Sequence, residues 1–249
     1  MMLAAVLLIA MLVALGWFAK DDVEEYRRFK ALATSRERRR RYWIWVAKQL
    51  AVFALPVVVG LAVIGRLGAV LTMPAEFAPL SGHLPSQASV DLAFNGDMAT
   101  GMLIGVALVG AGLGLLVAAR GRQVKVKPIG DVEALLPRNR AELVCGAVLS
   151  ISAGVTEELM FRLFLPLLIV LVTGSAIAAF VVPVLIFGFM HRYQGMAGVI
   201  ATTLIGALFA ALYLATQSLV TAMIVHALLD LNGLVLRPAL TGALRPAAD

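Results

Sequence analysis

Three charged side chains lie inside an apolar stretch of the chain, residues 143–173, and two of them are adjacent. They are Glu157, Glu158 and Arg162. Charged groups at bilayer depth are energetically costly, so they are normally paired and usually mark function. Because Glu158 and Arg162 are four residues apart on a helix, they share one face and can form an ion pair. Glu157 points in another direction, so we expect it to have a different partner and a different role.

Three polar residues further along the chain could meet Glu157. His191 ends the apolar segment 176–191, and His226 and Asp230 lie four residues apart on one helix face. Alone, each has a structural explanation, such as a hydrogen bond to a neighbouring helix. Together with Glu157 they form a set of two imidazoles and two carboxylates that could activate water or bind a metal ion. The sequence has no Gly-x-Ser-x-Gly, His-Glu-x-x-His or Walker-type motif that would indicate other chemistry.

The composition is that of a membrane protein. Of the 249 residues, 61% are hydrophobic, and the mean hydropathy is +0.93. Runs of about 20 apolar residues match the thickness of a bilayer core. The net charge of +6 raises the question of a nucleic-acid partner, but the placement of the charges indicates membrane topology instead. The single cysteine, Cys145, excludes an intrachain disulfide, and we interpret it as a small buried apolar residue.

The apolar runs predict an all-α, polytopic transmembrane bundle of about seven spans. Eighteen of the 21 Lys and Arg residues fall in segments that would then lie on one side, and only Arg66 would lie on the other. The positive-inside rule therefore predicts an outside N-terminus and a cytoplasmic C-terminus. Residues 143–173 are too long for one untilted span, so we expect a tilt, or a bend near Gly154 or Pro166. The predicted spans are residues 2–19, 42–64, 98–119, 143–173, 176–191, 196–214 and 219–236.

Basic and Pro-rich segments divide the chain into four parts. We predict an N-terminal three-span region (1–119), a basic cytoplasmic linker (120–142), a four-span catalytic core (143–236) and a cytoplasmic tail (237–249). Residues 65–97 are expected to form an outer loop, in which His83 is a solvated side chain. The basic segment 20–41 is interpreted as a topology determinant, with binding of anionic lipid headgroups as the alternative.

The order of the polar motifs resembles the CAAX-protease and bacteriocin-processing (CPBP, or Abi) family, intramembrane endopeptidases related to the type II CAAX prenyl proteases. The resemblance covers about residues 142–236, and the segment 191–195 is similar to bacterial members, which implies a bacterial cytoplasmic membrane. One position departs from the prenyl-protease branch, which tends to have Asn where this chain has Asp230. The motifs are Glu157-Glu158-x3-Arg162, Phe187-x3-His191 and His226-x3-Asp230.

The resemblance implies hydrolysis of peptide bonds in membrane-associated or membrane-delivered substrates. It assigns Glu157 as the general base, His191 as the residue that holds the water, and His226 with Asp230 as the pair that stabilises the oxyanion. Glu158 and Arg162 would support the helix face, and Phe187 would pack beside the site. The resemblance favours a mechanism with no cofactor. Zinc remains the alternative, and its ligands would be Glu157, His191, His226 and Asp230.

Two other functions are compatible with parts of this pattern. A non-proteolytic membrane regulator on the same scaffold would be expected to have lost a motif residue, and here none is lost. A secondary transporter commonly has two matching halves, whereas every intramembrane carboxylate of this chain lies in its second half. Asp230 itself has three possible roles: a protonated donor to the oxyanion, a partner of His226, or a metal ligand. The sequence specifies neither the substrate nor an oligomeric state.

Overall fold

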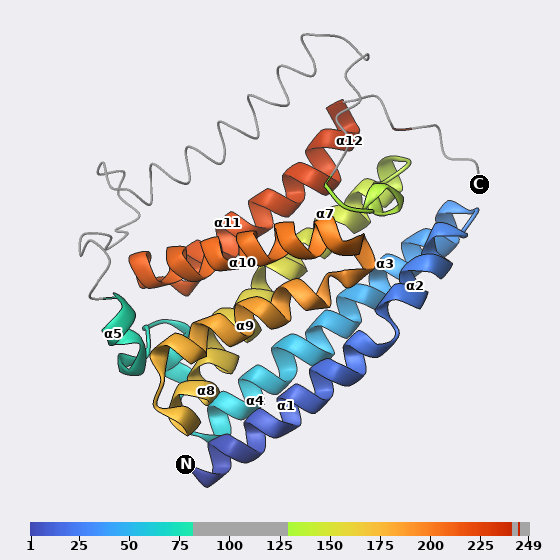
Figure 1. Cartoon of the computed structure of the whole chain (residues 1–249). Coiled ribbons are helices and arrows are strands. Elements are labelled where there is room, and N and C mark those ends of the chain that lie inside the picture. Colours follow the sequence, from blue (N-terminus) through green and yellow to red (C-terminus); the bar gives the residue numbers. More distant parts are fainter. Residues whose placement is uncertain (82–128, 241–243, 245–249) are drawn as a thin grey trace, which may run out of the picture.

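Helices make up almost all of the computed structural model, which describes residues 1–81, 129–240 and 244; no strand occurs among them. The N-terminal part forms two antiparallel helical rods (Figure 1). Thr34 starts the second rod with a capping box, because its hydroxyl accepts from the Glu37 amide while the Glu37 carboxylate reaches back to Thr34. The first rod contains α1 (Met2–Lys20) and α2 (Asp22–Lys30); the second contains α3 (Ser35–Gln49), the π-helical η1 (Leu50–Ala54) and α4 (Leu55–Val63).

The start of the predicted outer loop is partly helical. It contains η2 (Leu67–Val70), η3 (Ala75–Phe77) and the short α5 (Ala78–Ser81). Phe77 is fully buried, with its ring centroid 4.9 Å from that of Phe180 and 6.2 Å from that of Tyr213. Burial of this aromatic side chain fixes the segment against the core. Residues 82–97, with His83, lie outside the described part of the chain.

The C-terminal part begins with the short η5 (Glu133–Leu135) and is then a succession of longer helices. Gly174, at a positive φ of 71°, ends the first continuous helix and allows the chain to turn. The remaining elements are α7 (Arg140–Glu158), η6 (Leu159–Phe164), α8 (Leu165–Thr173), α9 (Ala176–Met190), η7 (Arg192–Gln194), α10 (Gly195–Thr216), α11 (Leu219–Leu231), η8 (Asn232–Leu236) and α12 (Arg237–Leu240).

The long helix 140–173 departs from α-helical geometry between the two positions at which we expected a bend. The departure is η6, a π-helical segment that ends directly before α8, in which Pro166 is the second residue. Proline has no N–H to donate to the preceding turn, which loosens the helix there. Pro56 stands in the same relation to η1. Gly154 has a different role, because a Cβ built on it would lie 2.6 Å from the backbone nitrogen of Ala227, so it allows α7 and α11 to approach closely.

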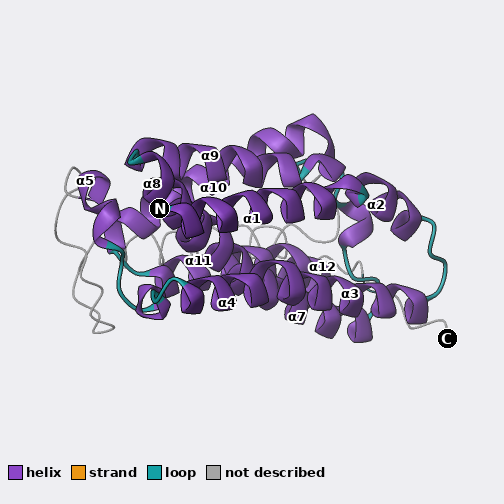
Figure 2. Ribbon diagram, turned by 90° about the horizontal axis from the view of Figure 1, so that it is seen from below, coloured by secondary structure: helices purple, strands orange, loops and turns teal. Residues whose placement is uncertain are grey.

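The described helices of the two halves pack against one another. α3 lies against α7 and α1 against α8, while α11 packs on α7 and α10 on α9 (Figures 1 and 2). The main apolar core includes η6 and α8, whose side chains are almost all buried. Because α7, η6 and α8 are central, the polar residues on them are surrounded by helices from both halves.

A buried ion pair also joins the halves. Nε of Arg38 in α3 lies 3.0 Å from Oε2 of Glu142 in α7, and both side chains are fully buried. The guanidinium also donates to the carbonyls of Ala134 (2.9 Å) and Leu136 (3.2 Å). The sequence placed Arg38 in a basic segment that sets topology, and did not predict its burial.

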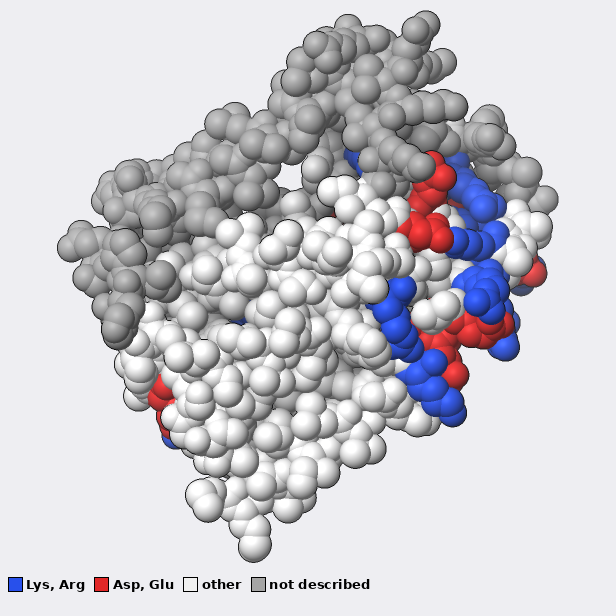
Figure 3. All heavy atoms as spheres, in the orientation of Figure 1, with Lys and Arg blue, Asp and Glu red and all other residues white. Residues whose placement is uncertain are grey.

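Four described helices are long and apolar enough to cross a membrane: Met2–Lys30, Ser35–Val63, Arg192–Thr216 and Leu219–Leu240. Ala176–Met190 is apolar but shorter. The predicted span 98–119, the first part of the predicted linker (120–128) and most of the tail lie outside the described residues. On the face in Figure 3, charged side chains gather at the end that carries α2 and the start of α3. The seven-span count, the orientation and the division into domains stay predictions.

Candidate active site

The ion pair predicted between Glu158 and Arg162 is present in the structure. Nε of Arg162 lies 3.2 Å from Oε2 of Glu158, and both side chains are fully buried. The guanidinium also lies over two aromatic rings, 4.7 Å from the centroid of Phe187 and 5.6 Å from that of Phe209. The charge of Arg162 is therefore balanced by one carboxylate and by the faces of two rings.

Glu158 has a second partner, which the sequence did not reveal. Its other oxygen, Oε1, lies 2.8 Å from Nδ1 of His226 on α11. Since a carboxylate accepts hydrogen bonds, the proton of this bond belongs to His226. Glu158 thus connects Arg162 with His226 and fixes the orientation of the imidazole ring. The close approach of α7 and α11 at Gly154 makes this contact possible.

The other nitrogen of His226 faces two carboxylates. Nε2 lies 3.9 Å from Oε2 of Glu157 and 3.7 Å from Oδ2 of Asp230. Both distances are too long for a direct hydrogen bond. The ring is stacked on Phe209, with centroids 4.7 Å apart and an interplanar angle of 24°. The fold therefore brings Glu157, which is distant in sequence, to the same nitrogen atom of His226 that faces Asp230.

His191 is oriented by the backbone of its own helix. Its Nδ1 lies 2.8 Å from the carbonyl oxygen of Phe187. A carbonyl oxygen can only accept, so Nδ1 carries the proton, and a neutral ring presents an unprotonated Nε2. The Phe187 ring lies 4.7 Å from the His191 ring and 6.2 Å from the His226 ring, centroid to centroid. Phe187 therefore packs between the two imidazoles and the Arg162 guanidinium.

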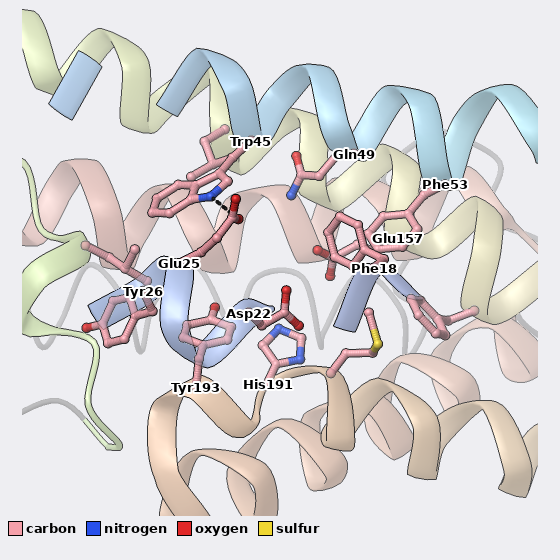
Figure 4. Close-up of a pocket in the computed structure, with 14 residues that line it drawn as sticks. Phe18, Asp22, Glu25, Tyr26, Trp45, Gln49, Phe53, Glu157, His191 and Tyr193 are labelled. Carbon is pink, nitrogen blue, oxygen red and sulfur yellow. Dashed lines mark hydrogen bonds between the residues drawn. The ribbon is translucent and has the colours of Figure 1, made fainter. Parts of the chain in front are cut away.

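Glu157 and His191 line the same cavity, which has a volume of about 140 Å³ (Figure 4). The Glu157 side chain is 12% exposed and accepts no hydrogen bond from any residue in the described part of the chain. His226 and Asp230 are not among the residues that line this cavity. Glu157 and His191 therefore share one cavity, whereas His226, 3.9 Å from Glu157, and Asp230 lie outside its lining.

The N-terminal half supplies half of the fourteen residues that line the cavity. The sequence had not connected these residues with the site, because segment 20–41 was interpreted through its basic residues alone. The available signal in this segment was its acidic and polar side chains, which stand beside the basic ones and could have indicated a contact with the site. The polar lining residues from this half are Asp22, Glu25, Tyr26, Trp45 and Gln49.

No set of three or more His, Cys, Asp and Glu side chains within the described ranges is arranged to hold a metal ion. The zinc alternative needs Glu157, His191, His226 and Asp230 as ligands. To bind one metal ion together, these four side chains would have to lie closer to one another than they do in the structure. Metal dependence stays a prediction that chelation can test.

Apolar helices around buried carboxylates and histidines define an integral membrane protein with a polar site inside its helical bundle. Residues 139–232, less than half of the chain, match the family model described as type II CAAX prenyl endopeptidase Rce1-like. This segment is therefore similar to the Rce1-like proteases, which supports the resemblance inferred from the motifs. The match spans every motif and leaves α1 to α4 outside it. A search of the curated proteins and a search of the solved structures found no match.

Proposed function

We propose that this protein is an intramembrane endopeptidase that hydrolyses peptide bonds in membrane-associated or membrane-delivered substrates, with Glu157 as the base that activates water. The observation that carries the proposal is the shared cavity of Glu157 and His191. Each of these side chains has a hydrogen-bond acceptor, the Glu157 carboxylate and the Nε2 of a neutral His191 whose Nδ1 donates to Phe187. A water molecule between them would donate one O–H to each acceptor and keep a lone pair for attack on a carbonyl carbon.

In the proposed reaction Glu157 removes a proton as the water oxygen bonds to the carbonyl carbon. The tetrahedral intermediate then carries the negative charge on the former carbonyl oxygen. Glu157 returns the proton to the amide nitrogen, the C–N bond breaks, and an amine and a carboxylic acid are formed. The same residue thus acts as base and then as acid.

His226 is placed to stabilise the oxyanion, with one condition that follows from its bond to Glu158. Because Nδ1 donates to Glu158, Nε2 can donate to an oxyanion only when the ring is an imidazolium. The Glu158 carboxylate supplies the counter-charge for that form. Arg162 holds the same carboxylate from the other side, so Glu158 and Arg162 act as positioning residues rather than as catalytic ones.

The experiment that tests the proposal compares the membrane proteomes of cells that produce the wild type or Glu157→Gln. Glutamine keeps the size of the side chain but cannot take up the proton, so we expect the substrate to accumulate uncleaved with the variant at equal protein levels. The main alternative is a non-proteolytic regulator on the same scaffold. A Glu157→Gln protein that produces the wild-type set of peptides would refute the proteolytic reading and favour the regulator.

A further inference from the structure

The wall of the active-site cavity that comes from the N-terminal helices carries polar groups among aromatic rings. It contains the carboxylates of Asp22 and Glu25 and the amide of Gln49, and no Lys or Arg of the described residues lines the cavity. Figure 4 shows Asp22 and Gln49 pointing into the same space as Glu157 and His191. These helices lie outside the segment that matches the protease family. The match to the family therefore does not account for this wall of the cavity.

The two carboxylates of this wall differ in whether they are paired. Glu25 is satisfied, because it lies 2.5 Å from Lys48 and 3.3 Å from Arg41, and accepts from the Trp45 indole at 3.3 Å. Asp22 has no hydrogen bond and no ion pair within 4 Å in the described part of the chain, although its Oδ2 is buried.

The positive group that most affects Asp22 is Arg192. It forms no ion pair with Asp22 within 4 Å, and its Nη1 is buried without a hydrogen-bond partner among the described residues. Its guanidinium donates to the carbonyl of Ala19 and lies 5.0 Å from the centroid of the Phe189 ring. Oε1 of Gln49 is also buried and has no hydrogen-bond partner in the described ranges. Buried acceptors with no donor are costly and are usually satisfied by a bound group. The cavity thus presents one unpaired carboxylate and one free amide oxygen beside the residues proposed to hold the attacking water.

We propose that Asp22, with Gln49, forms a subsite that binds a positively charged side chain, Lys or Arg, of the substrate next to the scissile bond. The statement that the bound side chain belongs to a substrate rests on the proposed function. The binding of a basic side chain by Asp22 does not. An ammonium or guanidinium group supplies the donors that both acceptors lack, and its charge matches that of Asp22. Catalysis would then belong to the family domain and selection of the substrate to the N-terminal helices.

The test measures binding in the Glu157→Gln background, so that captured peptides are not cleaved. Purified full-length protein in detergent is mixed with a synthetic peptide library randomised at the central positions, and mass spectrometry compares bound with unbound peptides. Three additional substitutions are compared: Asp22→Asn, Asp22→Lys and Asp21→Lys. Asp21 is exposed, adjacent in sequence and not part of the cavity lining, so its substitution changes the net charge equally and serves as the matched control.

We expect the Glu157→Gln protein to enrich peptides with Lys or Arg at one position. Asp22→Asn should reduce this enrichment about ten- to a hundredfold, as expected for loss of a charged hydrogen bond. Asp22→Lys should shift the preference to Asp or Glu, and Asp21→Lys should keep that of the parent. No enrichment of basic residues in the parent, or equal losses with Asp21→Lys and Asp22→Lys, would overturn the proposal. Size-exclusion profiles confirm folding, and Asp22→Asn, close in shape, keeps the test valid if Asp22→Lys does not fold.

Cleavage of the same library by the protein with Glu157 intact separates the two proposals. Cleavage that does not depend on Asp22, together with binding that does not depend on it, overturns the subsite and leaves the protease proposal standing. Asp22-dependent binding without any cleavage supports the subsite and counts against the protease.

Discussion

Replacing Glu158 with Gln should destabilise the protein more than any other single change in the site. The substitution removes the charge that faces the buried Arg162 guanidinium, whose three nitrogens have no hydrogen bond that satisfies geometric criteria. It also weakens the bond to Nδ1 of His226. Breaking one side of a buried ion pair costs about 3–5 kcal/mol. For a chain of this length that corresponds to a fall in Tm of roughly 6–20 °C.

Thermal unfolding of detergent-purified protein, followed by size-exclusion chromatography, measures this effect directly. Three variants make the comparison specific: Glu158→Gln, Arg162→Met and the double substitution. Arg162→Met leaves the Glu158 charge without the guanidinium and should also be destabilising. The double variant removes both charges, so it should recover much of the lost stability.

Glu157→Gln is the matched control, because it changes the adjacent carboxylate by the same chemistry. Glu157 has no ion partner within hydrogen-bond distance, so this variant should stay folded at the wild-type level and lose activity. Equal losses of folded protein for Glu157→Gln and Glu158→Gln would show that Glu157 is also structural. An additive double variant would refute the idea that Glu158 and Arg162 depend on one another.

Three other predictions concern the site and the topology. If Asp230 donates to the oxyanion, Asp230→Asn should keep substantial activity, whereas Asp230→Ala should lower the cleavage rate of an identified substrate about 10²–10³-fold. Loss of activity in both variants, together with inhibition of the wild type by a chelator, would instead support a metal ion. Gly154→Ala should lower activity and stability by overpacking α7 against α11, at a cost of about 1–3 kcal/mol, whereas Gly16→Ala, with open space around it, should not. In a Cys145→Ser background, cysteines at positions 34 and 87 should react with impermeant reagents only from the cytoplasmic and the outer side, respectively; the reverse pattern would overturn the orientation.

The sequence predicted the local features of the site and the set of motif residues that could meet Glu157, but not the individual contacts between distant helices. The pairing of Glu158 with Arg162 follows from helix periodicity, because both residues belong to one helix. The bond from Glu158 to His226 depends on how α7 and α11 pack, for which a single sequence has no signal. The contribution of Asp22 and Gln49 to the cavity depends in the same way on how the two halves fit together.

In the fold, too, features set by the local sequence were easier to predict than features set by packing between helices. Most of the described helices overlap the predicted apolar spans, and Gly174 lies at the predicted break between 143–173 and 176–191. The helical structure of the basic segment, α2 and the start of α3, did not follow from apolar runs. The π-helical segments before Pro56 and Pro166 were not predicted, although a proline was expected to bend the long helix. Arg38 is one of several neighbouring arginines, and nothing in that run distinguishes the buried one from those in solvent.

The burial of Arg38 with Glu142 has a consequence for how the chain is made. The two partners are 104 residues apart, and synthesis proceeds at about 5–20 residues per second. For roughly 5–20 s after Arg38 leaves the ribosome, its counter-ion does not yet exist. The second rod therefore cannot take up its final position as it emerges, since a fully buried, unpaired guanidinium is strongly unfavourable. Its docking must wait for the arrival of α7, so the enclosed site is completed late in biogenesis, when the two halves close on one another.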